Sequence, residues 1–133
     1  MTTLLQSRTL SVSIDCRPYR VYAFVSNPEN LPGWAAGLCK SVRKSDAGWI
    51  VETTQGPMNL RFAGKNDLGV LDHYVSPQSG VEVYVPMRVV SNGPGAEVLI
   101  TVFRLPEMSD EKYAEDAATV ARDLGTLKRV LER

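Results

Sequence analysis

One pair of neighbouring side chains has the residue types of an acid–base site. His73 is the single histidine of the chain, and it directly follows Asp72. Histidine changes its charge near neutral pH and a neighbouring carboxylate can orient the ring, so the pair suits proton transfer. Neighbouring residues on a strand, however, point to opposite faces. The two side chains therefore reach one small substrate only if a bulge interrupts the strand.

The aliphatic neighbours of this pair indicate which side chain faces inward. His73 has the same parity as Leu71 and Val75, whereas Asp72 belongs to the opposite parity. We therefore expect His73 to face the core side of its strand. A partly buried histidine bonded to the backbone is one interpretation of this position, and a catalytic base is the other. In an enzyme, the further groups suited to this chemistry would be Asp72, Tyr84 and Arg88.

Metal, redox and nucleotide chemistry have no motif in this chain. A single histidine excludes a multi-histidine metal site. Cys16 and Cys39 are the two cysteines, and the wide interval between them excludes a CxxC redox pair and a cysteine zinc site. The glycine-rich nucleotide loops, the GxSxG elbow and the EF-hand loop are absent from the sequence. We predict no metal and no cofactor, and we expect both cysteines to be buried thiols. The alternative, a disulfide between them, requires that the fold bring them close together.

A larger group of apolar side chains has the alternation of a pocket wall or of a core. Apolar residues occupy every second position over 83–89 and again over 98–102, on either side of a glycine-rich turn. Trp34 follows the helix breaker Pro32-Gly33 in an expected loop, where it is either a pocket wall or a core anchor. A closed core is the alternative interpretation of the whole set. The candidate ligand-binding residues are Trp34, Phe62, His73, Val83, Val85, Met87, Ile100, Val102 and Leu124.

Polar and charged residues alternate with these apolar ones along the expected strands. Opposite charges on adjacent strands of a solvated face stabilise weakly, by about 0.2–1 kcal/mol per pair. If a bulge put one strand out of phase, Arg88 or Glu52 would enter the cavity and bind a carboxylate or hydroxyl. The side chains expected on the solvated face are Glu52, Arg61, Glu82, Tyr84, Arg88 and Glu97.

Strands and helices must position these groups, and the sequence predicts both. Alternation predicts a strand over Thr9–Asp15, and Pro18 begins a short helix that ends near Val25. Asn27 caps a second helical turn, and Ser109 caps a long amphipathic helix that runs to Leu131. The class is therefore α+β. Further strands are expected at 38–43, 49–54, 59–63, 70–75, 81–90 and 97–103, with turns that include 46–48, 66–69 and 77–80.

Length and charge limit the molecule to one globular domain. The chain has 133 residues, 44% of them hydrophobic, which suits a single domain over residues 1–133. Its 15 basic and 15 acidic side chains cancel, which argues against a nucleic-acid partner or an anionic membrane surface. No stretch reaches the ~18 apolar residues of a membrane span, and the first residues lack a signal-peptide pattern. We expect a cytoplasmic protein.

The order of these elements, with several local stretches, resembles the helix-grip fold of the START-like, or SRPBCC, superfamily. The closer resemblance is to its bacterial polyketide cyclase/dehydrase-type members, and it covers about Thr9 to Leu131. It is specific for fold rather than function, because the superfamily has no universal catalytic motif. It implies a curved antiparallel sheet of about seven strands that grips the long helix and leaves a ligand-sized cavity. The stretches that carry it are Pro18–Val25, Asn27–Trp34, Gly69–His73, Val85–Val89 and Met108–Glu111.

Three functions follow from the residues and the resemblance together. The leading prediction is a module that binds a small hydrophobic molecule, such as a lipid, polyketide or aromatic metabolite, between sheet and long helix. The second is a polyketide cyclase or dehydratase with His73 as its acid–base group. The third is a domain that binds another protein, since some members of the superfamily act on chaperones or ribosomes.

The expected assembly is a monomer or a weak homodimer. The resemblance pairs the first strand with the last, and this pairing would cover the edge of the first strand. The exposed edge then falls on 38–43, where basic side chains oppose edge pairing. These are Lys40, Arg43 and the following Lys44. Apolar surface for a modest two-fold contact remains around Tyr19, Tyr22 and Trp34.

Overall fold

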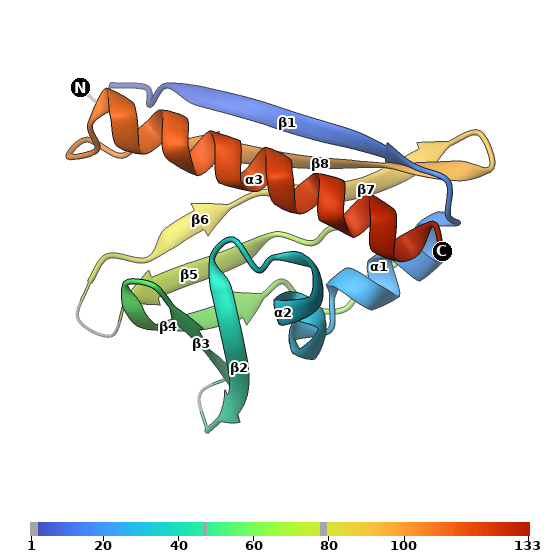
Figure 1. The fold of residues 1–133 in the computed structure, drawn as a ribbon, viewed down its shortest axis with the longest axis horizontal. Coiled ribbons are helices and arrows are strands. Elements are labelled where there is room, and N and C mark those ends of the chain that lie inside the picture. Colours follow the sequence, from blue (N-terminus) through green and yellow to red (C-terminus); the bar gives the residue numbers. More distant parts are fainter. Residues whose placement is uncertain (1–2, 47, 78–79) are drawn as a thin grey trace.

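Strands and helices follow one another in the order that the sequence predicts. The computed structural model describes residues 3–46, 48–77 and 80–133. The class is α+β, as predicted (Figure 1). Parts of the turns expected at 46–48 and 77–80, namely residues 47, 78 and 79, lie outside the described residues. The elements are β1 (Ser7–Ile14), α1 (Pro18–Val25), the 3₁₀ turn η1 (Pro28–Asn30), α2 (Leu31–Trp34), β2 (Cys39–Ser45), β3 (Gly48–Thr53), β4 (Gly56–Phe62), β5 (His73–Pro77), β6 (Val83–Val85), β7 (Met87–Asn92), β8 (Gly95–Phe103) and α3 (Asp110–Leu131).

Two antiparallel sheets form the gripping surface, with the strand orders β1-β8-β7 and β2-β3-β4-β5-β6. The prediction of one strand over 81–90 is wrong, because Pro86 lacks an N–H and separates β6 from β7. The strand expected from residue 70 begins only at His73, since Val70 forms an isolated bridge with Arg88 of β7 instead. This bridge links the two sheets across the break.

The first and last strands are neighbours, as the resemblance implies. Leu10 lies opposite Ile100 in the antiparallel register of β1 with β8. The expectation that this pairing covers β1 is wrong, however. β1 is one of the two terminal strands of its sheet, so β8 pairs with one edge of β1, and no strand of the described residues pairs with the other. β2 is one of the two terminal strands of the second sheet and has an exposed edge, as predicted.

Proline and asparagine determine where the short helices after β1 begin. Pro18 occupies the first turn of α1, where a missing N–H leaves no helical hydrogen bond unmade. Asn27 Oδ1 accepts a hydrogen bond from the Glu29 N–H at 3.1 Å and caps η1. The chain then continues into α2 across Pro32-Gly33, because proline is tolerated in the first helical turn. Trp34 therefore ends a helix, and the prediction that it lies in a loop is wrong.

Helix α3 lies along β1 and β8 (Figure 1). Ser109 Oγ accepts a hydrogen bond from the Lys112 N–H at 3.0 Å and caps the helix, as predicted. The C-terminal turns of α3 bury Leu124, Leu127 and Leu131 in the main core, together with side chains of α1, α2, β7 and β8. None of the helices in the described part of the chain has the length and hydropathy that a membrane crossing requires.

Candidate functional site

Strand register brings several predicted site residues together on the inner face of the sheet. His73 of β5 lies opposite Phe62 of β4 on one side and Val85 of β6 on the other. The centroids of the Phe62 and His73 rings are 5.0 Å apart. These three side chains and that of Val83 are partly exposed. We call Phe62, His73, Val83 and Val85 the open wall, because they form an apolar surface that water reaches.

The backbone determines the tautomer of His73. Its Nδ1 lies 3.0 Å from the carbonyl oxygen of Leu71. A carbonyl oxygen only accepts, so Nδ1 carries the proton, and Nε2 of the neutral ring is left as an acceptor. Burial lowers the pKa of His73, although the Leu71 contact and the charge of Asp72 act in the opposite direction. The open wall therefore offers a ligand one neutral hydrogen-bond acceptor.

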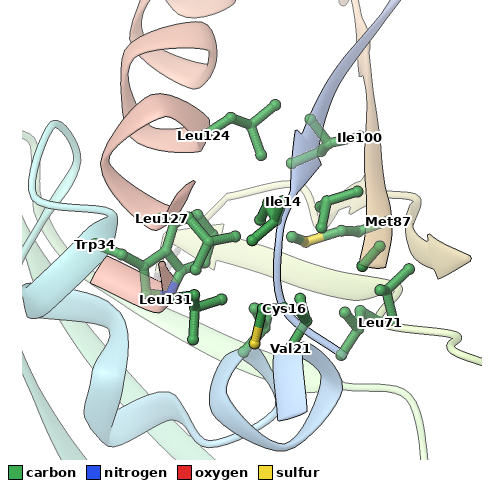
Figure 2. Close-up of a cluster of buried hydrophobic side chains, with 14 residues drawn as sticks. Ile14, Cys16, Val21, Trp34, Leu71, Met87, Ile100, Leu124, Leu127 and Leu131 are labelled. Atoms are coloured by element: carbon green, nitrogen blue, oxygen red, sulfur yellow. The ribbon is translucent and has the colours of Figure 1, made fainter. Parts of the chain in front are cut away.

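Four other predicted site residues lie in the main core, the buried cluster under α1, α2 and the C-terminal turns of α3 (Figure 2). We call this cluster the closed core. Met87, Ile100 and Leu124 are only 1%, 7% and 2% exposed. Trp34 is 6% exposed and belongs to the same cluster, which is the position of a core anchor rather than of a pocket wall. These four side chains are closed to a ligand in this conformation. Val102, the remaining predicted residue, is partly exposed on β8.

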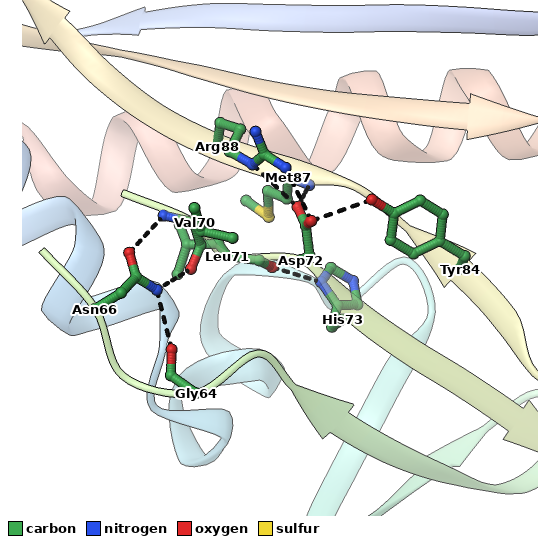
Figure 3. Close-up of polar contacts among 9 residues, drawn as sticks. All are labelled: Gly64, Asn66, Val70, Leu71, Asp72, His73, Tyr84, Met87 and Arg88. Atoms are coloured by element: carbon green, nitrogen blue, oxygen red, sulfur yellow. Dashed lines mark hydrogen bonds and ion pairs between the residues drawn. The ribbon is translucent and has the colours of Figure 1, made fainter. Parts of the chain in front are cut away.

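Asp72 points away from His73, into a polar cluster at the break between β6 and β7 (Figure 3). Its Oδ1 accepts a hydrogen bond from the Met87 N–H at 2.9 Å. The Arg88 guanidinium donates to both carboxylate oxygens, at 3.2 and 2.9 Å, and the Tyr84 hydroxyl donates to Oδ2 at 3.1 Å. These hydrogen bonds hold the pKa of Asp72 below its ordinary value, and the bond from Arg88 contributes most to this shift. We call Asp72, Tyr84 and Arg88 the outer clip.

The three residues of the outer clip and His73 are the four candidate acid–base groups, and the clip residues lie on the opposite face of the sheet from His73. His73 stays on the inner face, and the register of β5 with β4 and β6 is regular around it. The expectation that opposite charges pair across adjacent strands is confirmed for Arg43 of β2 and Glu52 of β3. The alternative, in which Arg88 or Glu52 enters the cavity, is wrong, because both are held in ion pairs on the outer face. The ion pairs are Arg43–Glu52 at 2.6 Å, Arg61–Glu82 at 3.1 Å and Arg88–Asp72 at 2.9 Å. Glu82 and Asp72 lie just before β6 and β5 rather than within them.

A pocket of about 250 Å³ adjoins the open wall at Phe62. It lies where α1 meets the loop between β4 and β5. The Tyr22 hydroxyl of α1 accepts a hydrogen bond from the Asn66 N–H at 3.0 Å and fixes this loop against the helix. The pocket combines an apolar floor with hydroxyl, amide and ammonium groups. Its lining residues are Tyr22, Ser26, Asn27, Phe62, Ala63, Lys65, Val70 and Leu71.

Apart from Phe62, the residues of this pocket were missed as site candidates, although one signal in the sequence relates to it. Asn66 and Gly69 mark a folded loop, and the Asn66 side chain accepts from the Leu68 and Val70 N–H groups. Gly69 has a φ of 73°, and a Cβ at this position would lie 2.1 Å from the Val89 carbonyl oxygen. The loop therefore approaches β7 more closely than any other residue type allows.

Buried thiols and scattered carboxylates do not form a metal centre in the described residues, where no group of three or more His, Cys, Asp or Glu side chains could hold an ion. Cys16 and Cys39 are free and buried, as the sequence predicts. Burial raises the pKa of the Cys39 thiol.

The arrangement of the elements matches solved structures, although no family model and no curated protein matches this sequence. The protein XoxI from Bacillus cereus has a TM-score of 0.75 at 18% identity over 96% of each chain. A START superfamily protein from Mycobacterium smegmatis has a TM-score of 0.69 at 14% identity, over 95% of this chain and 97% of its own. The Aha1 dimer from Colwellia psychrerythraea has a TM-score of 0.71 at 16% identity, over 96% and 97%. These likenesses show the fold, which is the START-like helix-grip fold that the resemblance implied.

Proposed function

We propose that the protein binds a small hydrophobic molecule against the open wall, between β4–β6 and α3. The observation that carries this proposal is the change in exposure along one inner face. Val85 and Val83 are partly exposed, whereas Met87, next in the same alternation, is 1% exposed. Covering apolar surface stabilises by about 25 cal/mol per Å², so a ligand that shields the wall gains binding free energy there. The helix-grip resemblance implies a ligand cavity between the sheet and the long helix, which agrees with this location.

The ligand that we propose carries a hydroxyl group on an otherwise apolar body. His73 Nε2 provides an acceptor within the wall, and Phe62 provides an aromatic surface beside it. The four side chains of the open wall are uncharged at neutral pH. An ionised group placed against them would lose its hydration without gaining a partner of opposite charge. A phenol or an apolar alcohol suits this surface better than a carboxylate does.

Binding of 2-naphthol tests the proposal, because this probe joins an apolar body to one hydroxyl. We expect calorimetric titration to show saturable binding, and 2-methoxynaphthalene, which cannot donate, to bind about tenfold more weakly. His73→Phe should remove this difference. If neither probe binds, the proposed function is wrong. If both bind equally well, only the role of the hydroxyl is wrong.

A pair of valine variants separates the two faces of the sheet in the same titration. Val83 lies on the open wall, and Val90 of β7 is exposed on the outer face, at 46%. We expect Val83→Asp to weaken 2-naphthol binding at least about tenfold, because it places a charge on the wall. Val90→Asp, the matched control, should bind like the unmodified chain. Equal effects of the two substitutions would place the binding surface elsewhere.

The geometry gives less support to a polyketide cyclase or dehydratase. Such an enzyme needs its acid and base around one substrate, and the outer clip holds Asp72, Tyr84 and Arg88 on the opposite face from His73. In that reaction His73 stays the predicted base, because its neutral Nε2 can take up a proton. If turnover of a substrate persisted in the His73→Ala variant, this role of His73 would be contradicted. Binding of another protein stays a prediction as well.

A further inference from the structure

β1 and β2, one terminal strand of each sheet, differ in how their free edges are protected. β2 carries Lys40, Arg43 and Lys44, and its register with β3 shifts near its first residue. Charged side chains and irregular register are common means by which an edge strand avoids pairing with other strands. β1 has neither protection, because all eight of its residues pair in register with β8 and Arg8 is its one charged side chain.

Alternate residues of β1 direct their backbone groups to the free edge. The Arg104 N–H donates to the Gln6 carbonyl oxygen at 2.8 Å, which places the even-numbered residues of this segment against β8. In an antiparallel pair the intervening residues direct their N–H and C=O groups the other way. Ser7, Thr9 and Ser11 are these residues, and all three are exposed. Their backbone groups on this edge have no hydrogen-bond partner among the described residues.

Helix α3 closes one end of this edge. Lys128 Nζ donates to the Ser13 carbonyl oxygen at 2.8 Å, and Glu132 accepts from the Asp15 N–H at the same distance. Lys128 and Glu132 also form an ion pair with each other at 2.7 Å. The part of the edge that stays open to another strand is therefore Ser7–Ser11.

We infer that this stretch pairs with the same stretch of a second copy of the chain, about a two-fold axis at Thr9. In an antiparallel pair centred there, Thr9 lies opposite its own counterpart and Ser7 lies opposite Ser11, so that every free N–H meets a free carbonyl. Arg8 lies opposite Leu10, which brings no like charges together. The formal charge of zero also leaves no net repulsion between the two copies.

Two exposed leucines before β1 favour a second copy as the occupant. Leu4 and Leu5 are 93% and 43% exposed. Continued in the same register, they reach the end of the second copy's edge that α3 closes, so they lie against the side chains of Lys128 and Glu132 there rather than pair with residues 13 and 14. This contact shields apolar surface that otherwise faces water. The pairing joins β7, β8 and β1 of both copies into one continuous sheet. It leaves the open wall on the second sheet of each copy free.

Sedimentation equilibrium of the full chain and of two Thr9 variants tests the inference. We expect a dimer mass for the unmodified chain at micromolar concentration. Thr9→Pro removes the N–H at the axis without removing a hydrogen bond to β8, and Thr9→Lys places two like charges opposite each other. Each substitution should raise the dimer dissociation constant at least about tenfold.

Thr101→Lys is the matched control. Thr101 lies beside Thr9 on the outer face, with their hydroxyl oxygens 2.8 Å apart, but it belongs to β8, away from the edge. This variant should stay dimeric. Thr9→Lys keeps every backbone group, so it decides the question if Thr9→Pro does not fold. A monomer mass for the unmodified chain at all concentrations would overturn the inference. A dimer that survives both Thr9 substitutions would also overturn it, because the interface would then lie elsewhere.

Discussion

The closed core and the open wall belong to one inner face and share one alternation of apolar residues, but they are covered differently. Met87 and Ile100 in the closed core lie under α1 and the C-terminal turns of α3. Phe62 and Val83 on the open wall remain partly exposed. Alternation thus determines the face that a side chain takes, whereas its burial depends on which other elements cross that face. The boundary falls at Pro86, between Val85 and Met87.

The largest difference between the two regions is expected when one apolar side chain in each is shortened. Leu127 is 0% exposed, so Leu127→Ala should cost about 3 kcal/mol of unfolding free energy through lost burial and a cavity. Val83 lies outside the buried clusters, and Val83→Ala should cost less than about 1 kcal/mol. Urea denaturation of both variants measures the contrast. Equal costs would show that the wall is packed as tightly as the core.

A smaller effect is expected at the junction between the regions, where Asp72 replaces a backbone acceptor for the Met87 N–H. Asp72→Asn should lower the unfolding free energy by about 2 kcal/mol at pH 7, because the bonds from Arg88 and Tyr84 need the carboxylate. The pKa of Asp72 is lowered in the fold, so its contribution is present above the ordinary value of 3.8 and disappears as the pH falls through the lowered pKa.

Urea denaturation of both chains at pH 7 and at strongly acidic pH tests this prediction. The difference between unmodified chain and variant should narrow in acid. Glu82→Gln serves as the control, because its ion pair with Arg61 is half exposed and should change stability by less than about 0.5 kcal/mol. A difference that is unchanged across the range would mean that the ionised state of Asp72 does not hold the junction.

The smallest expected effect concerns helix α3, which covers the closed core, rather than the sheet. Asp123 of α3 is 9% exposed and accepts one hydrogen bond, from the Gly37 N–H at 3.2 Å, and burial raises its pKa. Its contribution to stability is therefore greatest below the ordinary value of 3.8 and declines as the pH rises through the raised pKa. Asp123→Asn keeps an acceptor for Gly37 and removes the buried charge.

We expect this variant to gain roughly 0.5–1 kcal/mol at pH 7 and to lose that gain in acid. Thermal unfolding at both pH values measures the change. Destabilisation at pH 7 would instead show that Arg122 stabilises the charge more than burial opposes it. In that case the ionised carboxylate of Asp123 would help to hold α3 against the Gly37 backbone.

The sequence predicted correctly those features that depend on a single strand or helix. A strand has two side-chain directions, so the parity of Leu71 and Val75 predicted that His73 and Asp72 face opposite sides. Pro18 and Ser109 likewise predicted where α1 and α3 begin, because helix termini depend on local hydrogen bonds.

Contacts between distant segments could not be predicted in this way. Trp34 is buried because it meets Leu131 and its neighbours in the core, and nothing near Trp34 in the sequence indicates that contact. The break at Pro86 is stabilised by Asp72, which belongs to a different strand segment. The pocket beside Phe62 similarly needs α1 and the Asn66 loop to meet. For the candidate site, the sequence therefore identified the face but not the covered part of it.

The pairing of β1 with β8 also affects the order in which the chain can fold. Thr9 and Thr101, whose hydroxyls meet across these strands, are 92 positions apart. At a synthesis rate of about 5–20 residues per second, β1 waits roughly 5–20 s for its neighbour to be made. β2, β3 and β4 follow one another directly and can pair as they emerge, since short loops close at low entropic cost. We therefore expect the second sheet to form first, and β1 to be the segment of the nascent chain that most needs shielding by a chaperone.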